Sequence, residues 1–214
     1  LDEMNLARVE YYFADLLSIL EMPNRDEWLV DIVTDSWPKD PINIKINDIP
    51  LTVDDDLNVI VDMAKVAEDF LWMAQQCADR GYTEVNLNLG CPSGTVTAKG
   101  KGSGMLRDTD ALDRFLDAIF RDAPIPISVK TRIGFASPEE FPVLLDIFNR
   151  YPIKELTVHP RIRSTFYNGD ANLDAFRYAT ENSSNPLCYN GDILSLEQAR
   201  QLQEACPQIQ AVMI

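Results

Sequence analysis

The sequence predicts an α/β fold in which parallel strands alternate with helices, and the spacing of its apolar runs is the main evidence. Four runs each end in a polar residue, and successive ends are separated by 42, 29 and 31 residues. Helical patterns of apolar residues fill the intervals, for example at 110–120 and 141–148. Strands that alternate with helices at this period are typical of βαβ units and a parallel sheet. The polar strand ends are Asn88, Lys130, His159 and Asn190.

The first of these strands, at 83–89, leads into a turn that carries a cysteine. Polar and apolar residues alternate up to Leu89, and Gly90 predicts a turn where the thiol of Cys91 stands. A cysteine at the mouth of a strand, followed by proline and small residues, is accessible to a ligand. Free cysteines are more often small buried residues, so this segment alone leaves both interpretations open.

The later strands continue the same rhythm. They are predicted at 126–134, 155–161 and 186–192, with a fifth apolar run at 210–214. In a barrel of βα units, functional groups gather where the strands end and the βα loops begin. We therefore expect one face to carry Asn88, Cys91, Lys130, His159 and Asn190.

Five sequence elements, in this order and spacing, resemble the tRNA-dihydrouridine synthase family. The elements are Asn88-Leu-Gly-Cys91-Pro-Ser, Lys99-Gly-Lys-Gly-Ser-Gly104, Ser128-Val-Lys130-Thr-Arg132, Val158-His159-Pro-Arg161 and Asn190-Gly-Asp-Ile193. The resemblance runs from about residue 67 to residue 214. It implies a (β/α)₈ barrel of the TIM type that reduces uridine to 5,6-dihydrouridine in tRNA, with FMN as cofactor and NADPH as reductant.

The resemblance also implies roles for single residues. Cys91 matches the general acid that protonates C5 of uridine, and a thiol suits that role because its ordinary pKa of about 8.5 keeps it protonated near neutral pH. Lys130 and His159 match positions that contact the flavin. The turn Asn190-Gly191-Asp192 is the candidate for the FMN phosphate, since backbone N–H groups bind phosphate in barrel folds. Asn88 is the candidate for the uracil edge.

Charge gives a mixed indication about RNA. The net charge of −15 argues against a nucleic-acid binder, because phosphate contacts normally require a basic footprint. Basic residues nevertheless gather beside the cysteine loop and after His159. They suggest a basic rim, with a solvated loop surface as the other interpretation. The candidates for substrate binding on this rim are Lys99, Arg161 and Arg163.

The first 56 residues depart from the βα pattern. Residues 6–20 predict an amphipathic helix. The apolar runs 28–33 and 42–46 are separated by about eight residues that include prolines, which is too short for a crossover helix. We therefore expect 42–46 to form a hairpin with 50–53, around Asn47-Asp48.

Charge supports a boundary near this point. Residues 1–66 carry 15 acidic and 5 basic side chains, and the remainder carries 19 and 14. We expect an acidic segment over 1–56, which is a candidate contact for an unknown protein partner, and a flavin-binding barrel portion over 57–214. The nearest candidate for the barrel's third strand is 57–63.

The resemblance is incomplete at both ends. The family's Pro-Met-x-Gly turn and Pro-x-Gln motif are missing, and the sequence stops before the Gly-Arg-Gly turn and the helical domain. We therefore expect a partial or rearranged barrel. Two alternatives stay open: another FMN-dependent barrel oxidoreductase, such as a dihydroorotate dehydrogenase-like enzyme, or a non-enzymatic acidic module joined to an incomplete barrel.

Composition predicts a cytoplasmic protein without a metal site. No run of 18 apolar residues predicts a membrane helix, and no basic segment followed by an apolar core predicts a signal peptide. The four cysteines are widely spaced and the chain has one histidine, so a zinc site is not expected. Free thiols are typical of a reducing compartment. Core packing is the predicted role of Cys77, Cys188 and Cys206.

Overall fold

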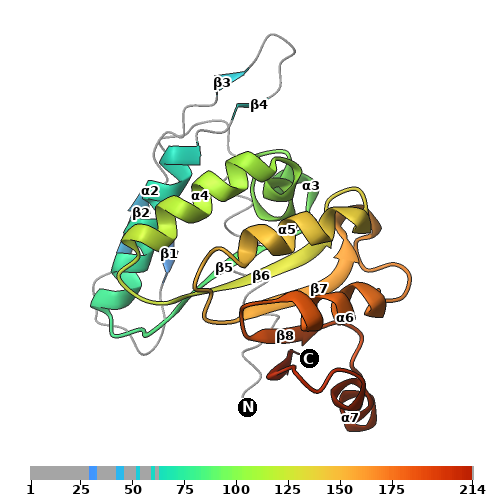
Figure 1. Ribbon diagram of the computed structural model, residues 1–214. Helices are drawn as coiled ribbons and strands as arrows, with labels where there is room; N and C mark the ends of the chain where they lie inside the picture. The colour runs from blue at the N-terminus through green and yellow to red at the C-terminus, as the bar shows by residue number, and fades with distance from the viewer. Residues whose placement is uncertain (1–28, 33–41, 46–51, 54–58, 61–62, 214) are drawn as a thin grey trace. The chain divides into compact units, whose positions relative to one another are not determined.

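The computed structural model describes residues 29–32, 42–45, 52–53, 59–60 and 63–213 (Figure 1). The chain divides into two compact units, Leu1–Pro50 and Leu51–Ile214. The second unit contains the parallel sheet and the residues of the predicted site. The helix predicted at 6–20 and the turn at Asn47-Asp48 lie outside the described residues.

The strands described before residue 63 form two antiparallel pairs. β1 (Leu29–Ile32) pairs with β2 (Ile42–Lys45), and β3 (Thr52–Val53) pairs with β4 (Val59–Ile60). The expectation that the first two are not parallel barrel neighbours is confirmed. The predicted hairpin between 42–46 and 50–53 is wrong. Each of these strands pairs with a different partner, because strand pairing depends on the register between segments and not on their closeness in sequence.

Five parallel strands form the main sheet, in the order β5-β6-β7-β8-β9. They are β5 (Val85–Leu89), β6 (Ile127–Gly134), β7 (Leu156–Ile162), β8 (Leu187–Asn190) and β9 (Ala211–Met213). The α/β fold with a parallel sheet is therefore confirmed. The parallel run does not begin at residue 57 as expected. The short β4 in this segment is antiparallel and α2 begins at Met63, so β5 is the first parallel strand among the described residues.

Helices precede and connect the parallel strands. The α-helices are α2 (Met63–Asp79), α3 (Gly94–Thr97), α4 (Thr109–Asp122), α5 (Phe141–Phe148), α6 (Leu173–Asn182) and α7 (Leu196–Ala205). The 3₁₀ turns are η2 (Gly102–Arg107), η3 (Pro138–Glu140) and η4 (Arg163–Thr165). Side-chain caps start three of the helices: Asp108 accepts from the Ala111 N–H, Asn172 from Ala175 and Ser195 from Gln198.

The core lies between one face of the sheet and the helices. Helices α4, α5 and α6 lie on one side of the sheet (Figure 1), as right-handed βαβ crossovers require. The strand residues of the apolar cluster include Leu87, Leu89, Val129, Leu156, Val158 and Leu187, and the helical ones include Leu116, Leu145, Phe148 and Phe176. Because side chains alternate along a strand, the residues between these positions point to the opposite face, and many of them are polar.

Leu145→Ala tests this core. Leu145 on α5 is fully buried, so its truncation should lower the free energy of unfolding by about 2 to 5 kcal/mol. Leu196→Ala is the matched control on α7, where the side chain is 75% exposed, and should change stability by about 0.5 kcal/mol or less. Urea denaturation followed by circular dichroism measures both. Equal losses in the two variants would contradict the described packing.

Candidate active site at the carboxyl ends of the parallel strands

Strand register places the predicted site residues on the polar face of the sheet. Asn88 on β5 lies opposite Lys130 on β6, Lys130 opposite Thr157 on β7, and Thr157 opposite Cys188 on β8. Two residues further along, Arg132 lies opposite His159. Residues in register, or two apart on one strand, share a face. The structure therefore brings Asn88, Lys130 and His159 to one face, and Cys91 follows directly at the end of β5.

Hydrogen bonds fix the backbone around Cys91. Three successive carbonyl groups in the loop after β5 each accept from a side chain elsewhere in the sequence. The Arg132 Nε donates to the Gly90 oxygen over 2.9 Å, the Ser103 Oγ to the Cys91 oxygen over 2.8 Å and the Arg163 Nε to the Pro92 oxygen over 3.2 Å. The free thiol of Cys91 is half-buried. The loop is thus held by its peptide groups, which leaves the thiol available for chemistry.

The glycine-rich turn packs directly on Cys91. Gly102 has φ of +55°, a conformation that side chains rarely adopt. A Cβ at this position would lie 2.9 Å from both the Cβ and the carbonyl oxygen of Cys91. The next residue, Ser103, also donates its backbone N–H to that oxygen over 3.0 Å. The glycine lets the turn approach closely enough for Ser103 to hold the loop.

Lys130 is a half-buried cation that makes no hydrogen bond or ion pair within residues 63–213. Burial is the main cause that lowers the pKa of its ammonium group, and the charge of Arg132 lowers it further. Interactions with Cys188 and Cys91 act in the opposite direction, which places both thiols near the lysine. A cation without a counter-ion, on a face where polar side chains gather, is suited to an anionic or electron-rich ligand.

His159 is buried and neutral at physiological pH. Burial, followed by the charges of Arg132, Lys130 and Arg161, lowers its pKa to about 4. Its Nε2 lies 3.1 Å from the Arg161 Nη1. A guanidinium can only donate, so Nε2 must accept and the imidazole proton resides on Nδ1. His159 therefore presents an N–H donor at Nδ1.

Arg161 and Asp192 form an ion pair beside this histidine. Arg161 is 6% exposed and also donates to the Gly169 carbonyl. Its guanidinium is the main cause that lowers the pKa of the Asp192 carboxyl group. Arg161 thus lies inside the structure rather than on an exposed rim. Arg163 is half-buried, and Lys99 is exposed.

The Asn190-Gly191 turn is fixed by its neighbours. The Asn190 amide donates to the Met213 carbonyl over 3.3 Å, which ties β8 to β9. A Cβ at Gly191 would lie 2.9 Å from the Tyr189 hydroxyl oxygen. The glycine lets the tyrosine ring lie close to the turn, and a larger residue would have to displace that ring.

Three residues that sequence reasoning did not assign to the site are part of it. Arg132 and Ser103 hold the cysteine loop, and Cys188 lies on the polar face, outside the apolar cluster that contains Cys206. The alternation Ser128, Lys130, Arg132 along β6 was the available signal, because a period of two on a strand marks one face. Cys188 shares that face with Lys130 through the register of β8.

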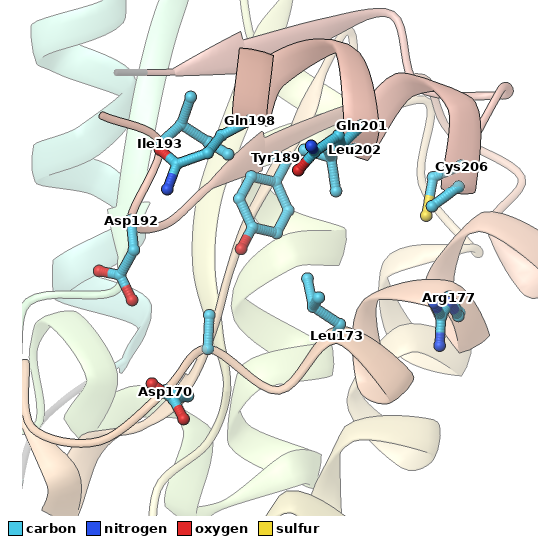
Figure 2. Close-up of a pocket in the computed structure, with 12 residues that line it drawn as sticks. Asp170, Leu173, Arg177, Tyr189, Asp192, Ile193, Gln198, Gln201, Leu202 and Cys206 are labelled. Atoms are coloured by element: carbon cyan, nitrogen blue, oxygen red, sulfur yellow. The ribbon is translucent and has the colours of Figure 1, made fainter. Parts of the chain in front are cut away.

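A separate cavity of about 300 Å³ lies beyond the β8–α7 turn (Figure 2). Figure 2 shows Tyr189 between Asp192 and Leu173, with Gln201 and Leu202 of α7 on one side. Cys91, Lys130 and His159 do not line it. In the part of the chain that the structure describes, no three His, Cys, Asp or Glu side chains gather to hold a metal ion. No described helix is both long and apolar enough to span a bilayer.

The chain's single histidine makes the charge state of His159 directly measurable. The ordinary pKa of 6.5 applies in the unfolded chain, whereas the folded value is about 4. Between these values only the unfolded chain takes up the proton, so stability should fall as pH drops from 6.5 towards 4, by about 3 kcal/mol at most. Proton NMR of the imidazole should give a midpoint near 4.

Lys130→Met should raise that midpoint, because it removes a neighbouring positive charge. Lys99→Met removes an exposed lysine that does not act on His159 and serves as the control. A wild-type midpoint near 6.5 would contradict the buried, neutral histidine.

Comparison with known proteins matches the same part of the chain. The family model "Dihydrouridine synthase (Dus)" matches residues 48–214. The chain is 34% identical over 124 residues to tRNA-dihydrouridine synthase B of Proteus vulgaris, which covers 58% of this chain and 38% of that protein. It is 32% identical over 150 residues to a probable tRNA-dihydrouridine synthase of Rickettsia prowazekii, covering 69% and 46%.

The chain spans less than half the length of these curated relatives. Among solved structures, Proteus mirabilis N-acetylneuraminate lyase matches with a TM-score of 0.49 and 15% identity, covering 77% of this chain and 52% of that one. The family model matches well over half of the sequence, from the second antiparallel pair through β9. The chain therefore belongs to the dihydrouridine synthase family.

Proposed function

We propose that this chain is the flavin-binding portion of a (β/α)₈-barrel enzyme that reduces uridine to 5,6-dihydrouridine in tRNA. Family membership supports the reaction class. The observation that carries the proposal is the convergence of an accessible thiol, an unpaired cation and a neutral imidazole on one polar face. These groups are Cys91, Lys130 and His159. FMN is the proposed cofactor and NADPH the proposed reductant.

The residues of the polar face fit a flavin. The unpaired ammonium of Lys130 suits the N1–C2=O edge of an isoalloxazine ring, where negative charge develops on reduction. His159 adds a neutral N–H donor at Nδ1 beside it. The Asn190-Gly191-Asp192 turn is the proposed phosphate contact, with Arg161 neutralising the Asp192 carboxylate. When bound and reduced by NADPH, FMN supplies a hydride to C6 of uridine.

Cys91 is the proposed general acid for C5. Its thiol holds the proton that completes the reduction, and its backbone is fixed by Ser103 and its neighbours so that the group is positioned before substrate arrives. Loss of the proton leaves a thiolate.

The remaining parts of the chain receive matching proposals. Asn88 is exposed on the same face and is the proposed contact to the uracil edge. Lys99, which is exposed, is the proposed basic residue on the RNA side, whereas the buried Arg161 is paired with Asp192 and Arg163 holds the Pro92 carbonyl. We propose 57–214 as the flavin-binding portion and 1–56 as an acidic segment that contacts a protein partner. The four free cysteines favour the reducing cytoplasm as its location.

Cys91→Ala should separate the two half-reactions. Dihydrouridine formation should fall by about 10²- to 10⁴-fold, the usual contribution of general acid catalysis. Flavin binding and reduction by NADPH should be unchanged, because the thiol acts only on the nucleobase. Product is measured in tRNA by mass spectrometry, and flavin by its visible absorbance. Cys77→Ala, which removes a half-buried thiol on α2, is the matched control and should retain both activities.

Lys130→Met should instead weaken FMN binding, with loss of the yellow colour on gel filtration.

Equal product formation by Cys91→Ala and wild type would remove Cys91 from the mechanism. A wild-type protein that stays colourless with added FMN would defeat the flavoenzyme proposal and favour the non-enzymatic alternative.

A further inference from the structure

Arginine and aromatic side chains alternate across the loops at the carboxyl ends of the strands. The Arg107 guanidinium carbon lies 4.0 Å from the centre of the Phe135 ring, and the Arg163 guanidinium lies 5.2 Å from the same ring. Arg163 also lies 5.2 Å from the Phe166 ring. We call Arg107, Phe135, Arg163 and Phe166 the arginine–aromatic stack. Its members come from the loops after β5, β6 and β7, so the fold assembles it at the edge where Cys91 lies.

The two arginines of the stack carry uncompensated charge. Arg163 donates only to neutral oxygens, those of Pro92 and Thr97, and Arg107 makes no ion pair in the described part of the chain. The carboxylates of Glu140 and Asp108 are already engaged by backbone N–H groups. Glu140 accepts three backbone N–H bonds, from Phe135, Ala136 and Ser137.

Asp108, next to Arg107 in the sequence, caps α4 and is likewise engaged with backbone N–H. Two positive charges without counter-ions in a chain of net charge −15 indicate that this edge is suited to an anion from outside.

A groove runs alongside the outer end of the stack. Its volume is about 370 Å³, within the range of small-ligand sites. Arg107 and Phe135 line it, and the remaining lining is mostly apolar: Leu106, Ala136 and Val143, with Thr109 and Glu140. Arg107 is exposed, and Phe166 is 40% exposed at the other end of the stack. An apolar lining beside an unpaired guanidinium suits a base and its phosphate.

From this juxtaposition we infer that the groove binds one nucleotide of single-stranded RNA, with its base against the apolar lining at the edge of Phe135 and its phosphate on Arg107. Unstacked RNA bases are bound on aromatic rings and guanidinium planes, while arginines contact the phosphates. The inference rests on the proposed function, because tRNA is the ligand that would present the nucleotide. It adds a second point of attachment, separate from Cys91 and the uridine that reacts there.

Fluorescence anisotropy with labelled oligouridine and with a tRNA transcript tests the groove. Arg107→Ala should weaken binding of both probes roughly tenfold, the scale of one lost hydrogen bond to a charged group. It should also reduce the slope of log K against log salt by about 0.7, the value for one phosphate on a single strand. Arg200→Ala is the matched control: it removes the same charge from an exposed position on α7 and should leave binding unchanged.

Two further variants separate stacking from charge. Phe135→Leu should weaken binding with no change in salt slope, because it removes the ring and keeps the arginine. Arg107→Lys should keep the slope and lose part of the affinity, because an ammonium lacks the planar face. Thermal unfolding of each variant by circular dichroism establishes that it is folded.

The outcomes separate the groove from the reaction. If the Arg107→Ala variant binds RNA as well as the Arg200→Ala variant does, the groove is not an RNA site. If the wild-type protein still forms dihydrouridine in that case, the proposed function is retained. If Arg107→Ala alone weakens RNA binding but the wild-type protein reduces no uridine, the groove is supported as an RNA site and the proposed reaction is contradicted. Failure of wild type to bind either RNA overturns the groove. If polyglutamate displaces the RNA at the same concentration of negative charges, the RNA site is contradicted and an acidic protein partner is favoured.

Discussion

The hydrogen bonds of one buried arginine hold together the loops from which the candidate site is built. Arg132 is 1% exposed, and its guanidinium donates to the carbonyls of Gly90, Ile162 and Phe166. A buried cation is costly unless its donors are satisfied, so the three carbonyls and the arginine are mutually dependent. The bond to Gly90 fixes the residue before Cys91, and the bond to Phe166 secures a backbone with φ of +54°.

The distribution of charge follows from the same arrangement. Arg132 and Lys130 carry positive charge into the polar face, and Asp192 compensates only Arg161. Burial, reinforced by these charges, keeps the imidazole of His159 neutral, so that it acts as a donor at one nitrogen. An acidic chain can therefore contain a cationic site, because the net charge is a sum over the whole molecule and a ligand contacts only a small part of its surface. The overall −15 was a poor guide to this edge of the molecule.

Local sequence patterns predicted those parts of the fold that depend on local contacts. Alternation of polar and apolar residues identified β5, apolar runs identified β6 to β9, and the helical period identified α4 and α5. Strand pairing near residues 29–60 was mispredicted because the choice of partner depends on register between segments, which no single segment encodes. Similarly, sequence placed Arg161 on a rim because its counter-ion, Asp192, lies 31 residues away. Its burial is a consequence of the tertiary fold.

Arg163 links the arginine–aromatic stack to the cysteine loop. The same guanidinium lies between Phe135 and Phe166 and donates to the carbonyl of Pro92, the residue after Cys91. A phosphate drawn to this cation would compete with the Pro92 carbonyl for its donors, whereas a phosphate on Arg107 leaves that bond intact. Arg107 is exposed and makes no ion pair in the described region, so an anion can bind there without releasing the cysteine loop. The two arginines of the stack therefore have different roles. Arg107 is available to bind a ligand, and Arg163 holds the backbone of the cysteine loop on which the proposed chemistry depends.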